Sequence, residues 1–162
     1  MTLEPLILKM ISYDHGSPER IQHFLKVHSF AKTIAVSEKL NEKTLFITEA
    51  AAIVHDLGIR LCLEKYGDGN GKLQEKEGPA LAEQMLSELG FEKDVIERVS
   101  FLVGHHHTYT GIDGLDYQIL VEADFLVNLF EGNTDTAHIR ATYDNIFRTE
   151  TGKKICREMF GL

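Results

Sequence analysis

The apolar positions of the chain recur mostly every three or four residues, which is the period of an amphipathic helix. The clearest run begins after Ser17, which we expect to cap a helix with Pro18 at its first position, and it continues to about Leu40. Its stripe consists of Ile21, Phe24, Leu25, His28, Ala31, Ile34 and Ala35. Further helices are predicted over residues 42–56, 79–89, 92–107, 117–130, 135–147 and 152–160, and a weaker one over 3–12.

Glycine and proline mark the ends of these helices. Gly58 is expected to close the helix over 42–56, and Pro79 to open the next one. The segment between them, "KYGDGNGKLQEKEG" (65–78), is rich in glycine and charge, which predicts a loop. No segment alternates apolar and polar residues as a strand does, and no repeat is present. The fold class predicted is therefore all-α, a bundle of about seven helices.

Composition agrees with an ordinary folded domain of 162 residues, 43% hydrophobic and 26% charged, and we expect residues 1–162 to form one domain. A formal charge of −8, from 25 acidic and 17 basic residues, argues against nucleic acid as a partner. Cys62 and Cys156 offer no disulfide framework. The N-terminal segment lacks the basic lead and apolar length of a signal peptide or membrane span, so we expect a cytoplasmic protein without membrane contact.

The stretch "AAIVHDLGI", residues 51–59, ends an apolar helical run in the pair His55-Asp56. Neighbouring side chains on a helix point about 100° apart, so these two converge most easily near a helix end with a metal ion between them. The alternative is that His55 is a hydrogen-bonded core residue and Asp56 a solvated residue of the last turn. The pair alone does not separate these interpretations.

Two other polar residues stand on apolar helix faces. His28 belongs to the stripe of the first long helix, and Asp124 lies within "ILVEADFLVNLF", where an unpaired buried carboxylate would be costly. Three helices would thus bring two nitrogen and two oxygen ligands together. Such a set suits Mn, Fe, Co, Ni or Zn and, less well, Mg, with positions left open for water or substrate. It is the ligand set of a catalytic ion.

These residues resemble the HD-domain superfamily of metal-dependent phosphohydrolases, in which a histidine, a His-Asp pair and a distant aspartate lie on helices of an all-α fold. The matching segments are "VHSFA", "IVHDLG" and "VEADFLVN", within roughly residues 20–130. The resemblance implies an HD-domain-like bundle and hydrolysis of a phosphate ester, usually in a nucleotide or nucleotide-like small molecule, by a metal-activated water. Asp56 would then serve both metal binding and catalysis.

Many members of the superfamily bind a second ion through further histidines between the pair and the last aspartate. Here "GHHH" (104–107) supplies His105 and His106, whereas Glu77 stands where another histidine is expected. Glu77 could be a ligand of a second ion, bridged by Asp56 at about 3.5–4 Å from the first, or the general base for the attacking water. One or two ions are therefore expected, although the histidines could instead form a solvated helix cap.

Four further histidines are assigned to other roles. We expect His15, His23 and His138 at the surface, because they fall in loops or off the apolar stripes. His107 is assigned to a solvated helix end.

A phosphate ester needs positive charge beside the metal ligands. Lys32 lies one turn after the first ligand histidine, on the same helix face, and is the best candidate for holding the phosphate group. Arg60 and Lys72 lie near or in the glycine-rich loop, which could close over a substrate as a lid or be an ordinary solvated loop. Asn128, one turn after the distant aspartate, could donate to a phosphate or hold that aspartate in place.

Three classes of function follow. The leading hypothesis is a metal-dependent phosphohydrolase acting on a small-molecule phosphate ester, with Lys32 steadying the charge and Glu77 or a nearby carboxylate taking the proton. The second is a di-iron oxygenase of HD-domain type, against which the glutamate at position 77 counts. The third is a nucleotide-sensing module without turnover. A homodimer through the apolar termini is compatible with the sequence.

Overall fold

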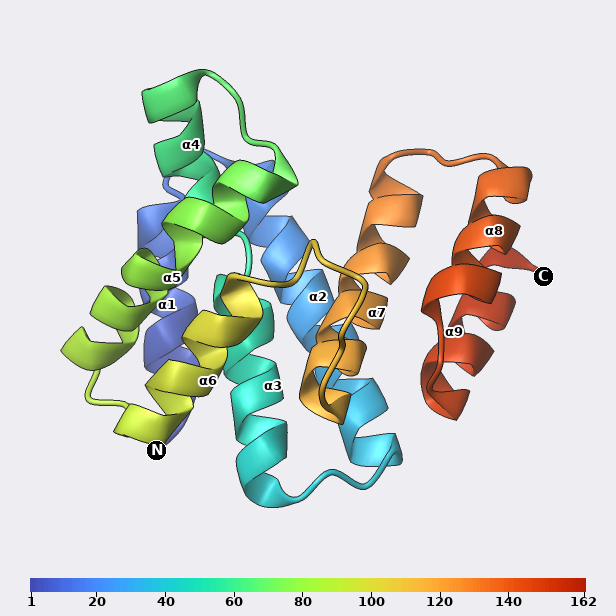
Figure 1. Ribbon diagram of the computed structural model, residues 1–162, viewed down its shortest axis with the longest axis horizontal. Helices are drawn as coiled ribbons and strands as arrows, with labels where there is room; N and C mark the ends of the chain where they lie inside the picture. Colours follow the sequence, from blue (N-terminus) through green and yellow to red (C-terminus); the bar gives the residue numbers. More distant parts are fainter.

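The computed structural model describes residues 1–162, and its only regular elements are α-helices (Figure 1). Nine helices follow one another: α1 Glu4–Tyr13, α2 Pro18–Ser37, α3 Glu42–Val54, α4 Gly58–Tyr66, α5 Gly71–Glu88, α6 Lys93–Val103, α7 Leu115–Glu131, α8 Thr136–Ile146 and α9 Glu150–Phe160. The all-α prediction is confirmed. The count is nine rather than about seven, because the apolar pattern indicates α1 only weakly and does not indicate α4.

The largest difference from the prediction lies between α4 and α5. The prediction of a loop over residues 65–78 is wrong, since only residues 67–70 lie between the two helices. Asn70 caps α5, and its side chain accepts a hydrogen bond from the main-chain N–H of Leu73 at 3.1 Å. Pro79 then falls inside α5 instead of opening it. This connection is shorter than the glycine-rich lid considered from the sequence.

Gly58 begins α4 rather than ending α3. A Cβ atom at Gly58 would lie 3.3 Å from backbone atoms of Gly78 on α5, and one at Gly78 would lie 2.7 Å from Cγ1 of Val103 on α6. The two glycines therefore allow α4, α5 and α6 to pack closely. A pattern of apolar positions cannot reveal this role, because it depends on which helices meet.

Helices α2, α3 and α7 form the centre of the molecule and pack against one another, with α8 and α9 beyond α7 (Figure 1). On the other side lie α1 and α4 to α6, of which α1 and α6 pack on α3. The second half of α3 is buried at every position from Ile47 to Val54 and includes three consecutive alanines, Ala50–Ala52. Small side chains let neighbouring helices approach. The end of α3, where His55 and Asp56 follow, is thus held among other helices.

The C-terminal helices are fastened to α7 by a buried carboxylate. Glu122 of α7 is fully buried and accepts hydrogen bonds from the main-chain N–H of Thr149 at 2.9 Å and from its hydroxyl at 2.7 Å. Thr149 in turn caps α9 by accepting from the N–H of Gly152 at 2.9 Å. The start of α9 therefore has a defined place on α7.

None of the nine helices combines the length and apolar character needed to span a membrane. Cys62 and Cys156 are both buried and unpaired. Burial raises the pKa of the Cys156 thiol to about 11, so it remains protonated at neutral pH. Neither cysteine belongs to the polar clusters described next.

Candidate metal centre

His55 and Asp56 follow the last residue of α3 and form the turn that leads into α4. His55 is fully buried, and its Nδ1 lies 2.8 Å from the main-chain oxygen of Ala52, to which it donates a hydrogen bond. Because this bond uses the Nδ1 proton, Nε2 presents its lone pair. Nε2 lies 3.3 Å from Oδ2 of Asp56, so the two neighbouring side chains face one point.

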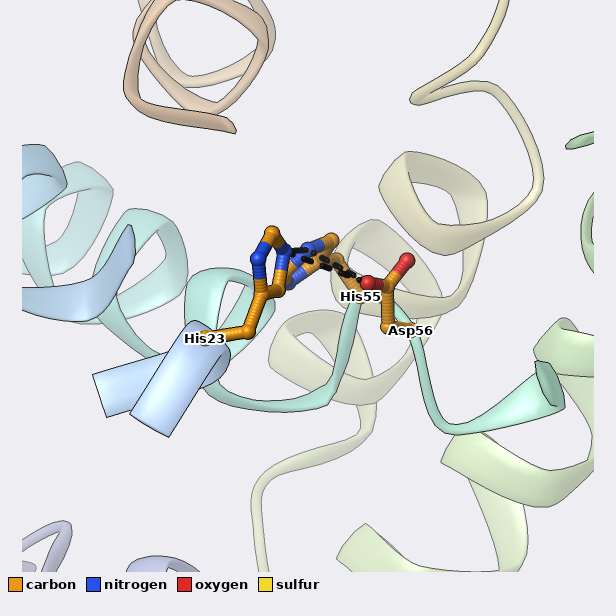
Figure 2. Close-up of side chains that lie close together, drawn as sticks. All are labelled: His23, His55 and Asp56. Carbon is orange, nitrogen blue, oxygen red and sulfur yellow. Dashed lines mark hydrogen bonds and ion pairs between the residues drawn. The ribbon is translucent and has the colours of Figure 1, made fainter. Parts of the chain in front are cut away.

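His23 of α2 meets the same point, and Figure 2 shows His23, His55 and Asp56 directed toward one another. Nε2 of His23 lies 3.2 Å from Nε2 of His55 and 3.2 Å from Oδ2 of Asp56. On the other edge of the ring, Nδ1 lies 2.5 Å from Oε1 of Glu131 at the end of α7. A carboxylate at Nδ1 holds the proton there and orients the ring so that Nε2 is available as a ligand.

Asp124 of α7 supplies the fourth side chain. Its Oδ1 lies 3.1 Å from Nε2 of His23 and 3.4 Å from Nε2 of His55. Asn128, one turn later on α7, donates a hydrogen bond of 2.9 Å to that oxygen and fixes the carboxylate. We call His23, His55, Asp56 and Asp124 the first cluster.

The first cluster fits a cation. Nε2 of His23 and Nε2 of His55 lie 3.2 Å apart, each lies 3.1–3.4 Å from an oxygen of Asp56 and an oxygen of Asp124, and both Nδ1 protons are engaged elsewhere. Two imidazole lone pairs and two carboxylate oxygens would repel one another at this distance unless positive charge lay between them. Donors about 2.0–2.2 Å from one ion lie roughly 3–3.5 Å apart, in the range found here. The residues therefore suit a divalent transition metal.

The electrostatics of the cluster lead to the same conclusion. Burial opposes charge on His23, but its hydrogen bonds to Asp124 and Asp56 raise its pKa to about 10. Burial likewise opposes ionisation of Asp56, but the adjacent histidines, His55 foremost, hold its pKa well below the usual range. The site thus favours positive charge at its centre and ionised carboxylates around it, as cation binding requires.

Asp56 also belongs to a second cluster, formed with His106 and His107 just after α6. One ligand atom from each of the three lies within 4.8 Å of the others. Nδ1 of His106 donates to the main-chain oxygen of Val103 at 2.8 Å, and its Nε2 lies 3.3 Å from Oδ1 of Asp56. The other oxygen of Asp56 faces the first cluster. One carboxylate shared between two clusters suits two bridged ions.

His107 is kept in the form that a metal can bind. Burial and the neighbouring His106 lower its pKa to about 4, so the imidazole is neutral at pH 7. Its Nε2 lies 3.1 Å from Oε1 of Gln74, and its main-chain N–H donates to Glu75 at 3.0 Å. Gly71 leaves room for the ring, because a Cβ atom there would lie 2.7 Å from Cγ of His107. Helix α5 therefore holds His107 through three positions.

Comparison with known proteins shows the family of this chain. A model of the HD domain matches residues 20–133, more than half of the chain and all residues of both clusters. The chain belongs to the HD domain family. Its fold is similar to the crystal structure, at 1.45 Å resolution, of a predicted HD superfamily hydrolase from an uncultured Thermotogales bacterium. The two are 24% identical with a TM-score of 0.71, over 98% of this chain and 86% of the other. A comparison with curated proteins finds no match.

The prediction that His28 is the first metal ligand of this HD domain is wrong. Nε2 of His28 lies 2.8 Å from Oε1 of Glu49, and His28 is not part of either cluster. The expectation that His23 is a surface residue is wrong, since its exposed fraction is 8%. His23 precedes the buried Val27 by four residues and the buried Ala31 by eight, so it continues their line along α2. That spacing was the signal in the sequence.

Helix α5 also differs from the prediction. Glu77 accepts hydrogen bonds from the hydroxyl of Tyr66 at 2.6 Å and from Nζ of Lys65 at 3.1 Å, and it contacts neither cluster. Gln74, about one turn earlier, is the α5 side chain that meets His107. His105 is likewise outside the second cluster, because its Nδ1 donates to the main-chain oxygen of Phe101 and the two rings stack 4.0 Å apart.

The predicted substrate residues lie in different places. Nζ of Lys32 lies 3.2 Å from Glu49, beside His28 and away from the first cluster. Lys72 is 79% exposed at the start of α5, and its nearest ion-pair partner is Glu75 at 3.5 Å.

Asn128 lies at the first cluster, whereas Arg60 makes its hydrogen bonds outside both clusters. Arg60 donates through Nε to Glu64 and through Nη1 to the main-chain oxygen of Tyr13 at 2.8 Å. Asn128 contacts Asp124, which is the second of the two roles considered for it.

Proposed function

We propose that this HD-domain protein is a metal-dependent phosphohydrolase that cleaves a phosphate ester of a nucleotide or nucleotide-like small molecule. The observation that carries the proposal is that Nε2 of His23 and Nε2 of His55 lie 3.2 Å apart and that each lies 3.1–3.4 Å from an oxygen of Asp56 and an oxygen of Asp124. A divalent ion held by these residues would supply a water of lowered pKa and would polarise a phosphoryl oxygen. The nucleotide part of the proposal rests on family resemblance.

The chain's own residues prepare this chemistry in three ways. Glu131 and the oxygen of Ala52 hold the Nδ1 protons of His23 and His55, which leaves both Nε2 atoms for the ion. Asn128 orients Asp124. Asp56 turns one oxygen to each cluster and thereby orients any group held between them. Since Glu77 lies elsewhere, we no longer assign the general base to that residue.

Nitrogen and oxygen donors in this ratio suit Mn, Fe, Co, Ni or Zn better than Mg. The second cluster can hold a second ion through Asp56, His106 and His107. Two clusters that share one carboxylate also suit a pair of iron ions, so a di-iron oxygenase of HD-domain type is the second candidate function.

Metal analysis together with activity separates these functions. Purified protein, free of any tag, would be analysed by mass spectrometry for bound metal and assayed without oxygen against nucleoside monophosphates in the presence of Mn²⁺, Co²⁺ or Ni²⁺. We expect phosphate release by the wild type, and loss of metal and activity together in Asp56→Ala with helicity retained. Full metal content in Asp56→Ala would refute the assignment. Oxygen consumption by the ferrous protein, without phosphate release, would favour the oxygenase.

A further inference from the structure

Arg20 lies on α2 three residues before His23, so the two side chains share one face of the helix. Its side chain is 29% exposed, so it is largely buried but still open to solvent. A permanently charged guanidinium in this position is suited to a ligand that carries negative charge.

A buried carboxylate orients Arg20. Nε of Arg20 donates to Oδ1 of Asp14 at 3.2 Å, and Asp14, which follows α1, is only 5% exposed. Nη1 and Nη2 of Arg20 make no hydrogen bond to the protein. The contact with Asp14 therefore uses one edge of the guanidinium and leaves the two terminal nitrogens free.

Arg98, by contrast, uses its whole guanidinium group for contacts within the protein. Its Nε, Nη1 and Nη2 all donate to carboxylates, at 2.7–3.0 Å from oxygens of Asp113 and Asp116. That guanidinium ties α6 to Asp113, just before α7, and to Asp116 in the first turn of α7, and all three of its nitrogens are engaged. Arg20 differs because two of its three guanidinium nitrogens have no hydrogen-bond partner in the protein.

Asp14, the partner of Arg20, belongs to the α1–α2 connection, which is joined to the turn that carries Asp56. The hydroxyl of Tyr13 donates to the main-chain oxygen of Leu57 at 3.0 Å, so the α1–α2 connection is joined to the residue directly after Asp56. Burial and the nearby charge of Asp56 raise the pKa of Asp14, which the adjacent arginines oppose. Asp14, Arg20 and Asp56 therefore lie in one electrostatic neighbourhood.

We propose that Arg20 is the phosphate-binding residue of this HD domain, with its two free terminal nitrogens directed at oxygens of the substrate's phosphate that the metal ligands do not hold. The proposal rests on the phosphohydrolase function proposed above. It replaces the assignment made from sequence to Lys32, whose ammonium group is engaged with Glu49. A planar fork that pairs with two phosphate oxygens gives stronger and more directional binding than an ammonium group.

The test measures binding of inorganic phosphate to the Mn²⁺-loaded protein by calorimetry, with metal content determined in parallel. Arg20→Gln is expected to bind phosphate roughly tenfold to hundredfold more weakly while keeping its metal and helicity. Arg140→Gln, on the exposed surface of α8, is the matched control and should bind as the wild type does. Arg20→Lys keeps the charge beside Asp14, so it protects the fold, and should bind more weakly than the wild type.

Wild-type affinity in Arg20→Gln or in Arg20→Lys would overturn the proposal. For a phosphate ester that the wild type cleaves, Arg20→Gln should show a raised KM, and an unchanged KM would count against Arg20. If the metal-loaded wild type neither binds phosphate nor cleaves an ester, the phosphohydrolase function fails and the role of Arg20 fails with it. If the wild type does both and Arg20→Gln matches it, only the role of Arg20 is lost.

Discussion

At the scale of single residues, two histidines on the same helix have different roles. His23 and His28 are five positions apart, so their side chains point about 140° away from each other around α2. His23 meets His55, Asp56 and Asp124, whereas His28 meets Glu49. Both are histidines paired with carboxylates, and only the first lies where several lone pairs converge. Residue type therefore does not decide the role, but the surroundings do.

Matched substitutions test this distinction. His23→Ala should lose most of the bound metal, because it removes a nitrogen donor and leaves Asp56 and Asp124 repelling each other. His28→Ala should keep the metal, since His28 has no contact with the cluster. Inductively coupled plasma mass spectrometry of the two purified variants gives the comparison. Equal metal loss in both, with circular dichroism unchanged, would contradict the assignment of His23.

At the scale of elements, close packing between α5 and the segment after α6 forms the second cluster. Gly71 in the first turn of α5 lies against the ring of His107, and Gln74 and Glu75 hold that residue by hydrogen bonds. Glycine at this position leaves room for a neighbouring side chain and is not needed for a turn. The position of His107 thus depends on the register of α5.

Substitution in the first turn of α5 should affect the second cluster alone. In Gly71→Ala, the new Cβ would lie 2.7 Å from Cγ of His107, so the ring must move. We expect about one ion per chain to be lost from a protein that binds two, while the first cluster keeps its ion. Gly69→Ala is the control, because its Cβ would make an ordinary contact of 3.5 Å with Ile59. Metal per chain, measured after dialysis, checks the prediction, and equal stoichiometry in both variants would refute it.

At the scale of the whole molecule, the first cluster joins parts of the chain that are far apart in sequence. Its ligands come from α2, the α3–α4 turn and α7, and helices α2, α3 and α7 form the centre of the fold. An ion held by them binds the folded state and not the unfolded chain. Metal binding is therefore coupled to global stability.

Chelation should lower the melting temperature of the whole protein. At a free metal concentration of about 100 times Kd, the bound ion contributes about 2.7 kcal/mol to the free energy of unfolding. For a domain of this size, each kcal/mol corresponds to roughly 2–4 °C. Differential scanning calorimetry with Mn²⁺ and with excess chelator measures the shift. The melting temperature of His23→Ala should not respond to metal, and a response equal to that of the wild type would contradict the coupling.

The sequence by itself determined the helical class, the order of the main helices and the family. Apolar spacing of three and four residues persists in almost every helix. The His-Asp pair and the distant aspartate can be recognised from short sequence segments. Asp124 could be assigned because an aspartate surrounded by apolar residues on both sides must be buried in any helical packing. These features are local, so no tertiary information is needed to see them.

Only the tertiary structure decided which partners meet. His23 and His28 both border the buried face of α2, and the choice depends on how α2 crosses α3 and α7. The sequence favours Lys32 as the phosphate-binding residue because it does not show that Lys32 pairs with Glu49, which lies on another helix. Likewise, α5 includes Gly78, whose close contacts with neighbouring helices cannot be read from the glycine-rich sequence. Periodicity specifies the face of a helix, but the residue that a face presents to a site depends on helix positions set by long-range packing.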